Sequence, residues 1–210
     1  MIEIFPGALE DSFSKVEEKI RMVEPYVDWL HFDVIDNTWA ENDSFRDPTP
    51  FKTLKTKLNL EIHFMFMDPT VVVGDWVDVG FKRLIAHVES RNPQDFINQV
   101  KESGVEVGLA LDGPTDVFKL EPFLSQIDQV TVMMIKAGKS GQKFMEENLE
   151  KIRWIHQKYP NLPIEVDGGI NPQTAKLAKE AGTTRLVSTS FLFWQNSGRI
   201  KEASEELKSA

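Results

Sequence analysis

The sequence predicts a single (β/α)8 barrel, an α/β fold of the TIM-barrel class, extending over residues 1–210. Short apolar runs alternate with longer amphipathic runs along the chain, which is the pattern of repeated βα units around a parallel sheet. The alternation occurs eight times, so each unit has about 26 residues. The length of the whole chain is therefore close to the lower limit for a closed barrel, roughly 200 residues. The alternative is an open doubly wound sheet, which would usually need fewer strands and a glycine-rich first turn that is missing here.

The strands are predicted where short apolar runs interrupt the amphipathic pattern. In chain order they are Ile2–Phe5, Trp29–Ile35, Glu61–Phe66, Arg83–Val88, Glu106–Leu111, Gln129–Ile135, Pro163–Asp167 and Thr184–Ser188. In a closed parallel barrel all eight strands end on the same side, and the loops that follow them form the active face. Polar residues at these strand ends are therefore the first candidates for a functional site.

Helix starts support this division of the chain. Asp or Asn can cap the first amides of a helix, and proline is tolerated at its first position. Such pairs occur at Asp47-Pro48, Asp68-Pro69, Asn92-Pro93 and Asn171-Pro172. Residues 14–17, Ser-Lys-Val-Glu, resemble a capping box that opens the first helix toward Glu24 and Pro25. Gly104 and Gly182 stand where a helix should end before the next strand.

Composition excludes several classes of protein. The chain has 41% hydrophobic and 27% charged residues, as in an ordinary globular protein, and no cysteine, which excludes disulfides and thiolate chemistry. The net charge of -9 provides no basic stripe for nucleic acid. No apolar run approaches membrane-spanning length, and no basic leader precedes the first strand. We therefore expect a cytoplasmic enzyme or binding protein that contacts neither nucleic acid nor membrane.

A candidate metal site is predicted at the ends of three strands. His31 and Asp33 are two residues apart in a strand, so their side chains project to the same side. An isolated pair of this kind would be read as a salt-linked structural pair. His63 and Asp167 lie at corresponding places in two other predicted strands. If all three strands open into one mouth, these four residues would suit one divalent ion of Zn, Mn or Fe, and the sequence does not choose among the three metals.

Two carboxylates at this site indicate acid–base chemistry. Asp33 and Asp167 come from strands far apart around the predicted barrel, so they could reach a bound substrate from opposite faces, one removing a proton while the other returns one. Paired acids for glycoside hydrolysis are the competing interpretation, which the neighbouring histidines fit less well. His87, at the end of the fourth strand, is expected to be a hydrogen-bonded structural histidine rather than a fifth ligand.

Small polar loops follow the last three strands and indicate an anion site. Glycine lets backbone amides approach a phosphate, and barrel enzymes often bind phosphate in this region. The glycines are Gly138 and Gly141 after the sixth strand and Gly168 and Gly169 after the seventh, with Ser190 after the eighth. Lys139 could add a local positive charge.

Two further groups of side chains are placed near the mouth. Met65 and Met133 would ordinarily be core residues, but facing the mouth they could form an apolar floor under a reaction intermediate. The longer connection Asn37–Asp47 could fold over the mouth as a lid, with Trp39 and Phe45 excluding water, or could be an ordinary loop anchored by these aromatic residues.

These residues resemble the ribulose-phosphate 3-epimerase family along nearly the whole chain. The similarity is densest in residues 28–36 (DWLHFDVID), 108–111 (GLAL), 141–144 (GQKF) and 166–170 (VDGGI). The resemblance implies a barrel of the ribulose-phosphate binding type that interconverts D-ribulose 5-phosphate and D-xylulose 5-phosphate through a metal-stabilised enediolate. It also implies a homo-oligomer.

The resemblance extends to individual residues of this sequence. It assigns the metal to His31, Asp33, His63 and Asp167, with Asp33 and Asp167 as the acid/base pair. Met65 and Met133 match methionines near the intermediate. Phosphate-side positions match Gly138, Gly141, Gly168, Gly169 and Ser190.

The chain departs from the family pattern at four places. The first strand usually ends in Pro-Ser, and here it reads Pro6-Gly7, which removes a pocket hydroxyl. Ile35 stands where the family usually has a methionine, after the first metal-binding aspartate. Residues 137–141 read Ala-Gly-Lys-Ser-Gly instead of Pro-Gly-Phe-Gly-Gly, and the usual Gly-Ser after the eighth strand is Thr189-Ser190.

Three functional hypotheses follow from this pattern. The first is a metal-dependent 3-epimerase of ribulose 5-phosphate. The second is the same chemistry on another ketose phosphate, such as a hexulose 6-phosphate, which the altered loops would permit. The third is a barrel that binds a metal or a sugar phosphate without turnover. Proton exchange at C3 of candidate sugars would distinguish them.

Overall fold

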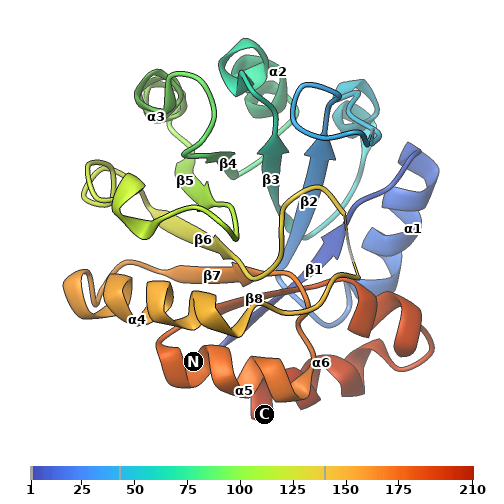
Figure 1. Cartoon of the computed structure of the whole chain (residues 1–210). Helices are drawn as coiled ribbons and strands as arrows, with labels where there is room; N and C mark the ends of the chain where they lie inside the picture. Colours follow the sequence, from blue (N-terminus) through green and yellow to red (C-terminus); the bar gives the residue numbers. More distant parts are fainter. Residues whose placement is uncertain (1, 43, 140) are drawn as a thin grey trace.

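The predicted fold class is confirmed by a closed barrel of eight parallel strands (Figure 1). The computed structural model describes residues 2–42, 44–139 and 141–210. The strands pair in chain order, and the last returns to the first. They are β1 (Glu3–Ala8), β2 (Trp29–Ile35), β3 (Asn59–Met65), β4 (Arg83–His87), β5 (Glu106–Leu111), β6 (Gln129–Met133), β7 (Ile164–Asp167) and β8 (Arg185–Ser188).

Helices cover the outside of this barrel, as the ribbon in Figure 1 shows. The α-helices are α1 (Phe13–Val23), α2 (Val73–Asp78), α3 (Pro93–Glu102), α4 (Leu149–Lys158), α5 (Pro172–Ala181) and α6 (Ile200–Ser209). Shorter turns are the 3-10 segments η1 (Thr49–Thr53), η2 (Pro69–Val72), η3 (Val117–Lys119) and η4 (Glu146–Asn148), and the π-helical η5 (Ser190–Gln195).

Two of the eight connections contain a 3-10 turn but no α-helix among the described residues, which departs from the predicted regular repeat. The connection after β2 contains η1, and that after β5 contains η3. Prolines at positions 48 and 50, and at 114 and 122, explain this, because each removes an amide donor and disfavours helical geometry in the preceding residue. The helix predicted after Asp47-Pro48 is accordingly only a short 3-10 turn.

The helix cap predicted at Asn171 is confirmed, whereas Asn92 and residues 14–17 do not form the predicted side-chain caps. At α5 the side chain of Asn171 accepts hydrogen bonds from the amides of Gln173 and Thr174, completing a capping box. Asn92 precedes α3 in the left-handed region, at φ 51°, without a side-chain cap. The capping box predicted at residues 14–17 is wrong, because α1 begins at Phe13 with Ser12 at the N-cap position, so residue 14 already lies in the first turn.

Strand boundaries differ from the prediction mainly at β1 and β6. β1 continues to Ala8 because Gly7 pairs with His31 and Ala8 with Phe32 of β2. β6 ends at Met133, the last residue paired with β7, two residues earlier than predicted. The extension of β1 brings residue 7 to the mouth of the barrel.

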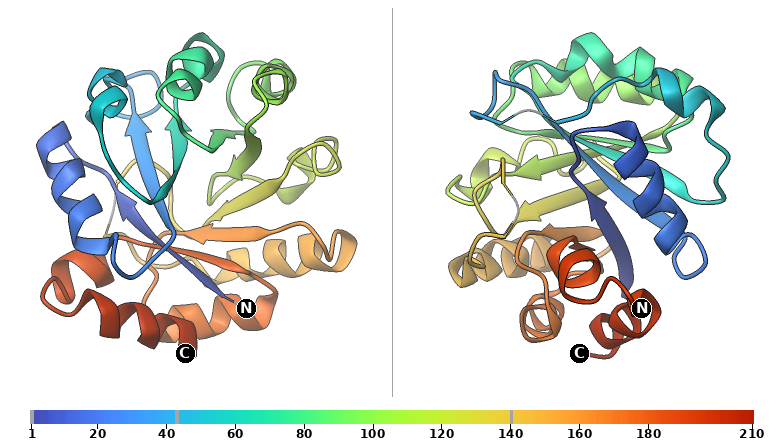
Figure 2. Two further views of the ribbon diagram at one scale, coloured as in Figure 1. Left: turned by 180° about the vertical axis from the view of Figure 1, so that it is seen from behind. Right: turned by 90° about the vertical axis from the view of Figure 1, so that its right-hand side faces the viewer.

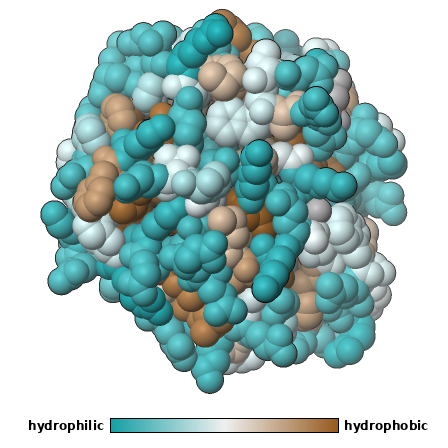
Figure 3. All heavy atoms as spheres, in the orientation of Figure 1, coloured by the Kyte–Doolittle hydropathy of each residue, from teal (hydrophilic) through white to brown (hydrophobic). Residues whose placement is uncertain are grey.

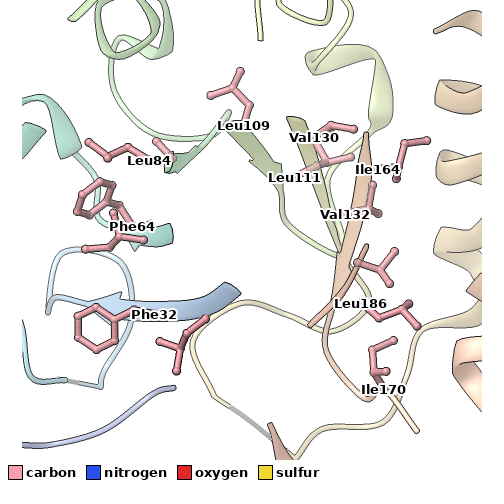
Figure 4. Close-up of a cluster of buried hydrophobic side chains, with 14 of the residues drawn as sticks. Phe32, Phe64, Leu84, Leu109, Leu111, Val130, Val132, Ile164, Ile170 and Leu186 are labelled. Carbon is pink, nitrogen blue, oxygen red and sulfur yellow. The ribbon is translucent and has the colours of Figure 1, made fainter. Parts of the chain in front are cut away.

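The main hydrophobic core lies between the strands and the helices. Residues on the outward face of the strands, such as Phe32, Phe64 and Leu84, are completely buried in this layer. Figure 4 shows these residues together with Leu109, Val132 and Leu186 from strands farther around the barrel. Burying each of these side chains contributes about 1.5–3 kcal/mol to folding.

The inside of the barrel is polar below the mouth. Inward residues of neighbouring strands stand opposite one another: His31 beside Glu61, Glu61 beside Arg83, and Glu165 beside Thr131. All five are fully buried. This charged layer supports the candidate site from below.

Hydrophilic residues cover most of the face drawn in Figure 3, with apolar residues in small patches between them. The two chain ends lie near each other beside α5 and α6 (Figure 2). Among the residues that the structure describes, no helix combines the length and the apolar character needed to cross a membrane.

Candidate active site

The four predicted metal-binding residues converge at the mouth of the barrel. Asp33 Oδ1 lies 3.2 Å from His31 Nε2 and 2.9 Å from His63 Nδ1. One donor atom from each of His31, Asp33, His63 and Asp167 lies within 4.8 Å of the others. The side chains come from β2, β3 and β7, as the alternation of strand residues predicts. Their role as ligands stays a prediction.

The chemistry of these donors fits a divalent cation. Two imidazole nitrogens and two carboxylates are a common set for Zn, Mn or Fe. Burial opposes the charged form of His31, yet the surrounding carboxylates, chiefly Asp33, raise its pKa well above the usual range. This shift reflects an excess of negative charge, which a bound cation would compensate. The four residues could therefore hold one metal ion.

The two aspartates have pKa values displaced in opposite directions. Burial opposes ionisation of Asp33, but His31 and then His63 outweigh it and hold the pKa of that carboxyl well below its usual range. For Asp167, burial and then the charge of Asp33 raise the pKa to about 6. Carboxyl groups with separated pKa values are suited to opposite roles in proton transfer.

His31 is oriented by a buried carboxylate that the sequence did not single out. Its Nδ1 donates to Glu61 Oε1 at 2.7 Å, which leaves Nε2 facing Asp33. Glu61 is in turn paired with the fully buried Arg83, whose Nε donates to Glu106 at 2.8 Å. A carboxylate behind a ligating histidine fixes its tautomer and its ring orientation. The available signal was the position of Glu61, two residues before His63 on the same side of β3.

His63 is supported by a second histidine. His63 Nε2 and His87 Nε2 are 2.9 Å apart, and His87 Nδ1 lies 3.2 Å from Glu89 Oε2. Burial lowers the pKa of His87, so the neutral ring is favoured. His87 thus makes the hydrogen bonds expected of a structural histidine. It contacts the ring nitrogen of His63 that is turned away from Asp33, as Glu61 does for His31.

Replacing His87 with phenylalanine should weaken Zn²⁺ binding by about 10- to 100-fold, because His63 Nε2 loses its partner. The phenyl ring would keep the packing, since the His87 ring lies 4.3 Å from that of Trp39 and 4.8 Å from that of His63. Competition with a coloured chelator measures the affinity. His156→Phe, at an exposed position of α4, is the matched control. An unchanged affinity in His87→Phe would contradict a supporting role.

All the predicted substrate-side residues border one cavity above the four donors. The cavity is lined by Leu9, Asp33, Met65, Met133, Ile135, Gly138, Lys139, Gly141, Asp167, Gly168, Gly169, Ile170, Val187, Thr189 and Ser190. Met65 and Met133 pack with Ile35, Ile135 and Ala137 in a small apolar cluster. The two methionines thus give the cavity an apolar side near the carboxylates, and their place under a reaction intermediate stays a prediction.

The loop after β7 requires glycine at two successive positions. Gly168 has φ 108° and Gly169 has φ 68°, both in the left-handed region. A Cβ on Gly168 would lie only 2.5 Å from Ile135 Cγ1. These two residues therefore bring backbone close to the cavity where a side chain could not fit. Ser140, in the loop after β6, lies outside the described residues.

The connection Asn37–Asp47, expected to be either a lid or an anchored loop, divides into two parts. Trp39 packs on the apolar cluster at the mouth and beside His87, and Asn42 Nδ2 donates to Gly138 O at 2.9 Å, joining this segment to the loop after β6. Phe45 does not lie at the mouth: it packs on Phe13, 5.9 Å between ring centroids, against the main core. Of the two alternatives for this segment, a lid or an anchored loop, Phe45 therefore fits the anchored loop. Asp43 of this segment lies outside the described residues.

Comparison with known proteins identifies the family. The model of the Ribulose-phosphate 3 epimerase family matches residues 3–193. The chain belongs to the ribulose-phosphate 3-epimerase family. Membership makes it an epimerase, an enzyme of the isomerase class.

The relatives cover most of the chain. Ribulose-phosphate 3-epimerase of Schizosaccharomyces pombe is 32% identical over 198 residues, 91% of this chain and 86% of the relative. The cytoplasmic isoform of the enzyme of Oryza sativa subsp. japonica is 35% identical, with 91% and 87% covered. The Bacillus subtilis enzyme is 32% identical, with 98% of both chains covered.

Solved structures support the fold alone. The crystal structure of 3-hexulose-6-phosphate synthase from Salmonella typhimurium superimposes with a TM-score of 0.75 over 99% of both chains, at 16% identity. At this identity the likeness carries no statement about the reaction.

Two of the departures from the family pattern, at positions 7 and 189, meet beside the cavity of this epimerase. A Cβ placed on Gly7 would lie 2.2 Å from Thr189 Oγ1. The side chain that is absent from β1 and the one added after β8 therefore claim the same space.

Proposed function

We propose that this epimerase interconverts D-ribulose 5-phosphate and D-xylulose 5-phosphate by moving a proton at C3. The observation that carries the proposal is the convergence of Asp33, Asp167, His31 and His63 beside one cavity whose other wall is built from the glycines of the late loops. The names of the relatives, ribulose-phosphate 3-epimerases, support the substrate.

Proton transfer is assigned to the two aspartates. The C3 proton of the ketose is acidified by the C2 carbonyl, and one carboxylate removes it to leave an enediolate. The other carboxyl group returns a proton to C3 from the opposite face, which inverts that carbon. Asp33 on β2 and Asp167 on β7 are separated by β1 and β8, so they approach the cavity from different sides. Their oppositely shifted pKa values match one base and one acid.

The proposal includes one divalent metal ion, with His31, His63, Asp33 and Asp167 as its ligands. The ion would supply positive charge beside the carbonyl and hydroxyl oxygens of the sugar, where negative charge develops. Glu61 and His87 hold the two imidazoles in place for it. The two imidazoles and two carboxylates suit Zn, Mn or Fe.

The phosphate is assigned to the late loops. Gly138, Gly141, Gly168 and Gly169 have positive φ angles and line the cavity together with Ser190. Backbone amides in such loops can donate to phosphate oxygens without obstruction by side chains. Lys139, in the same wall, adds a positive charge.

A second candidate is the same reaction on another ketose phosphate, such as a hexulose 6-phosphate. The observation that favours it is the altered cavity wall: Thr189 and Lys139 border the cavity where the sugar chain would lie, and Gly7 lies directly beside Thr189.

Solvent deuterium exchange into C3, followed by NMR, tests the proposal. Protein loaded with Zn, Mn or Fe is incubated with D-ribulose 5-phosphate and, separately, with a hexulose 6-phosphate in D2O. We expect fastest exchange with D-ribulose 5-phosphate, its loss with a chelator and its return with the metal. Faster exchange with the hexulose 6-phosphate would favour the second candidate. Absence of exchange with every metal and sugar would leave only a non-catalytic binding protein.

A further inference from the structure

The ends of β1 and β8 form a junction in the wall of the cavity. The two strands pair through Pro6 and Ser188, and the next residues, Gly7 and Thr189, continue at the mouth. A Cβ on Gly7 would lie 2.2 Å from Thr189 Oγ1 and 3.1 Å from Val187 Cγ1. The first distance is far below any contact between nonbonded atoms. Only one of positions 7 and 189 can therefore direct a side chain into this space.

Thr189 lines the cavity together with Asp33 and Asp167. Two other hydroxyls in and next to β8 have partners: Ser188 Oγ donates to Ile170 O at 3.3 Å, and Thr183 Oγ1, before the strand, donates to Ile164 O at 2.7 Å. Within residues 2–42, 44–139 and 141–210, Thr189 Oγ1 makes no hydrogen bond. It is a polar atom of a cavity-lining residue, and its capacity to donate and accept a hydrogen bond is unused.

We propose that the Thr189 hydroxyl binds the substrate directly, by a hydrogen bond to an oxygen of the sugar phosphate, and that Gly7 is glycine because this hydroxyl takes the space of a side chain at position 7. The inference rests on the proposed function for the identity of the sugar. It deepens that function by assigning a specificity-determining residue that the sequence marked only as a departure.

The position of Thr189 gives this contact its chemistry. Thr189 lies between Val187, the last inward residue of β8, and Ser190, which borders the same cavity beside the glycine loops. An acyclic ketose phosphate carries hydroxyl or phosphate oxygens along its whole length, so a group between the carboxylates and the late loops meets a polar atom of the ligand. A threonine hydroxyl can both donate to and accept from such an atom.

The first test compares Thr189→Val with Thr189→Ser. Valine keeps the shape and removes the hydroxyl, whereas serine keeps the hydroxyl. For D-ribulose 5-phosphate we expect kcat/KM to fall roughly three- to tenfold in Thr189→Val, the effect of one neutral hydrogen bond, and to stay close to wild type in Thr189→Ser. A residue that only packs would give equal kcat/KM in these variants. Equal values in Thr189→Val and wild type would overturn the proposal.

The second test exchanges the side chains between the strands. Gly7→Ser alone should lose activity, because the new Cβ forces the threonine side chain to rotate away from the cavity wall. Thr189→Gly alone loses the hydroxyl. The double variant Gly7→Ser/Thr189→Gly restores one hydroxyl without the collision, and we expect its kcat/KM to exceed that of either single variant. Independent, multiplicative losses would show that the two positions do not share one space.

Failure of the Thr189 proposal can be distinguished from failure of the proposed function. If wild-type protein exchanges no C3 proton, the function fails, and the role of Thr189 is then read from binding. The shift in Tm produced by D-ribulose 5-phosphate is compared in wild type, Thr189→Val and Thr189→Ser. A smaller shift in the valine variant alone supports the contact, and identical shifts in all three, or no shift in any of them, refute it.

Discussion

Asp167→Asn is expected to lower kcat for proton exchange at C3 by about 10²- to 10⁴-fold, the contribution of a positioned acid or base. An amide has nearly the shape of a carboxyl group, so the cavity is retained while the group that exchanges the proton is lost. NMR detection of deuterium at C3 of D-ribulose 5-phosphate measures the effect. Metal content is measured in parallel, because Asp167 is also a proposed ligand.

Stability provides the control for this variant. The pKa of Asp167 is raised to about 6 from 3.8, so its ionisation disfavours the folded state. In cation-free protein the variant should therefore be at least as stable as wild type at pH 7, and the difference should shrink as the pH falls from 6 toward 4. Asp75→Asn, at an exposed position of α2, should leave both exchange and Tm unchanged. Undiminished exchange in Asp167→Asn would refute its role in proton transfer.

The candidate site could be predicted because it follows from local rules. His31 and Asp33 share one face of β2 through the two-residue period of a strand. His63 lies near the end of β3 and Asp167 ends β7, and these strands open on the same side. The family motifs lie in the same segments. No long-range packing had to be known for the convergence of these four residues.

The contacts behind the site could not be predicted, because they depend on strand register, which the sequence leaves open. Glu61 and Arg83 stand opposite each other only because β3 and β4 pair in one particular register. Each begins an apolar run, where a charged residue usually marks a solvent-exposed strand end. The closed barrel instead buries both of them. The contact of Gly7 with Thr189 was equally hidden, because it requires β8 to close against β1.

The irregular connection after β2 has a local signal in the sequence. Asp47-Pro48 is typical of a helix start, but Pro50 follows two residues later and limits the segment to η1. For Phe45, a large aromatic residue in a long loop is compatible with either a lid or an anchor. Its contact with Phe13 on α1, which the sequence could not reveal, decides for an anchor.

Arg83→Met is expected to cost about 3–5 kcal/mol of folding free energy, because it removes the guanidinium partner of the buried carboxylate of Glu61 and leaves that carboxylate with His31 alone. Arg83 and Glu61 side chains are both completely inaccessible to solvent. Burial and the charge of Glu61 already raise the pKa of Glu165 well above its usual range, so the layer has no spare positive charge. Urea unfolding with a chelator present measures the loss separately from metal binding.

An exposed ion pair on α4 is the control for this prediction. Arg153 pairs with Glu150 on α4, where the two side chains are 48% and 77% exposed. Arg153→Met should therefore cost at most about 1 kcal/mol. Neutralising the orphaned carboxylate in Arg83→Met/Glu61→Gln should recover about 0.5–3 kcal/mol of the loss, since the penalty is that of an unpaired buried charge. If Arg83→Met costs no more than Arg153→Met, the charged layer is not desolvated, and the orientation of His31 through Glu61 would lose its physical basis.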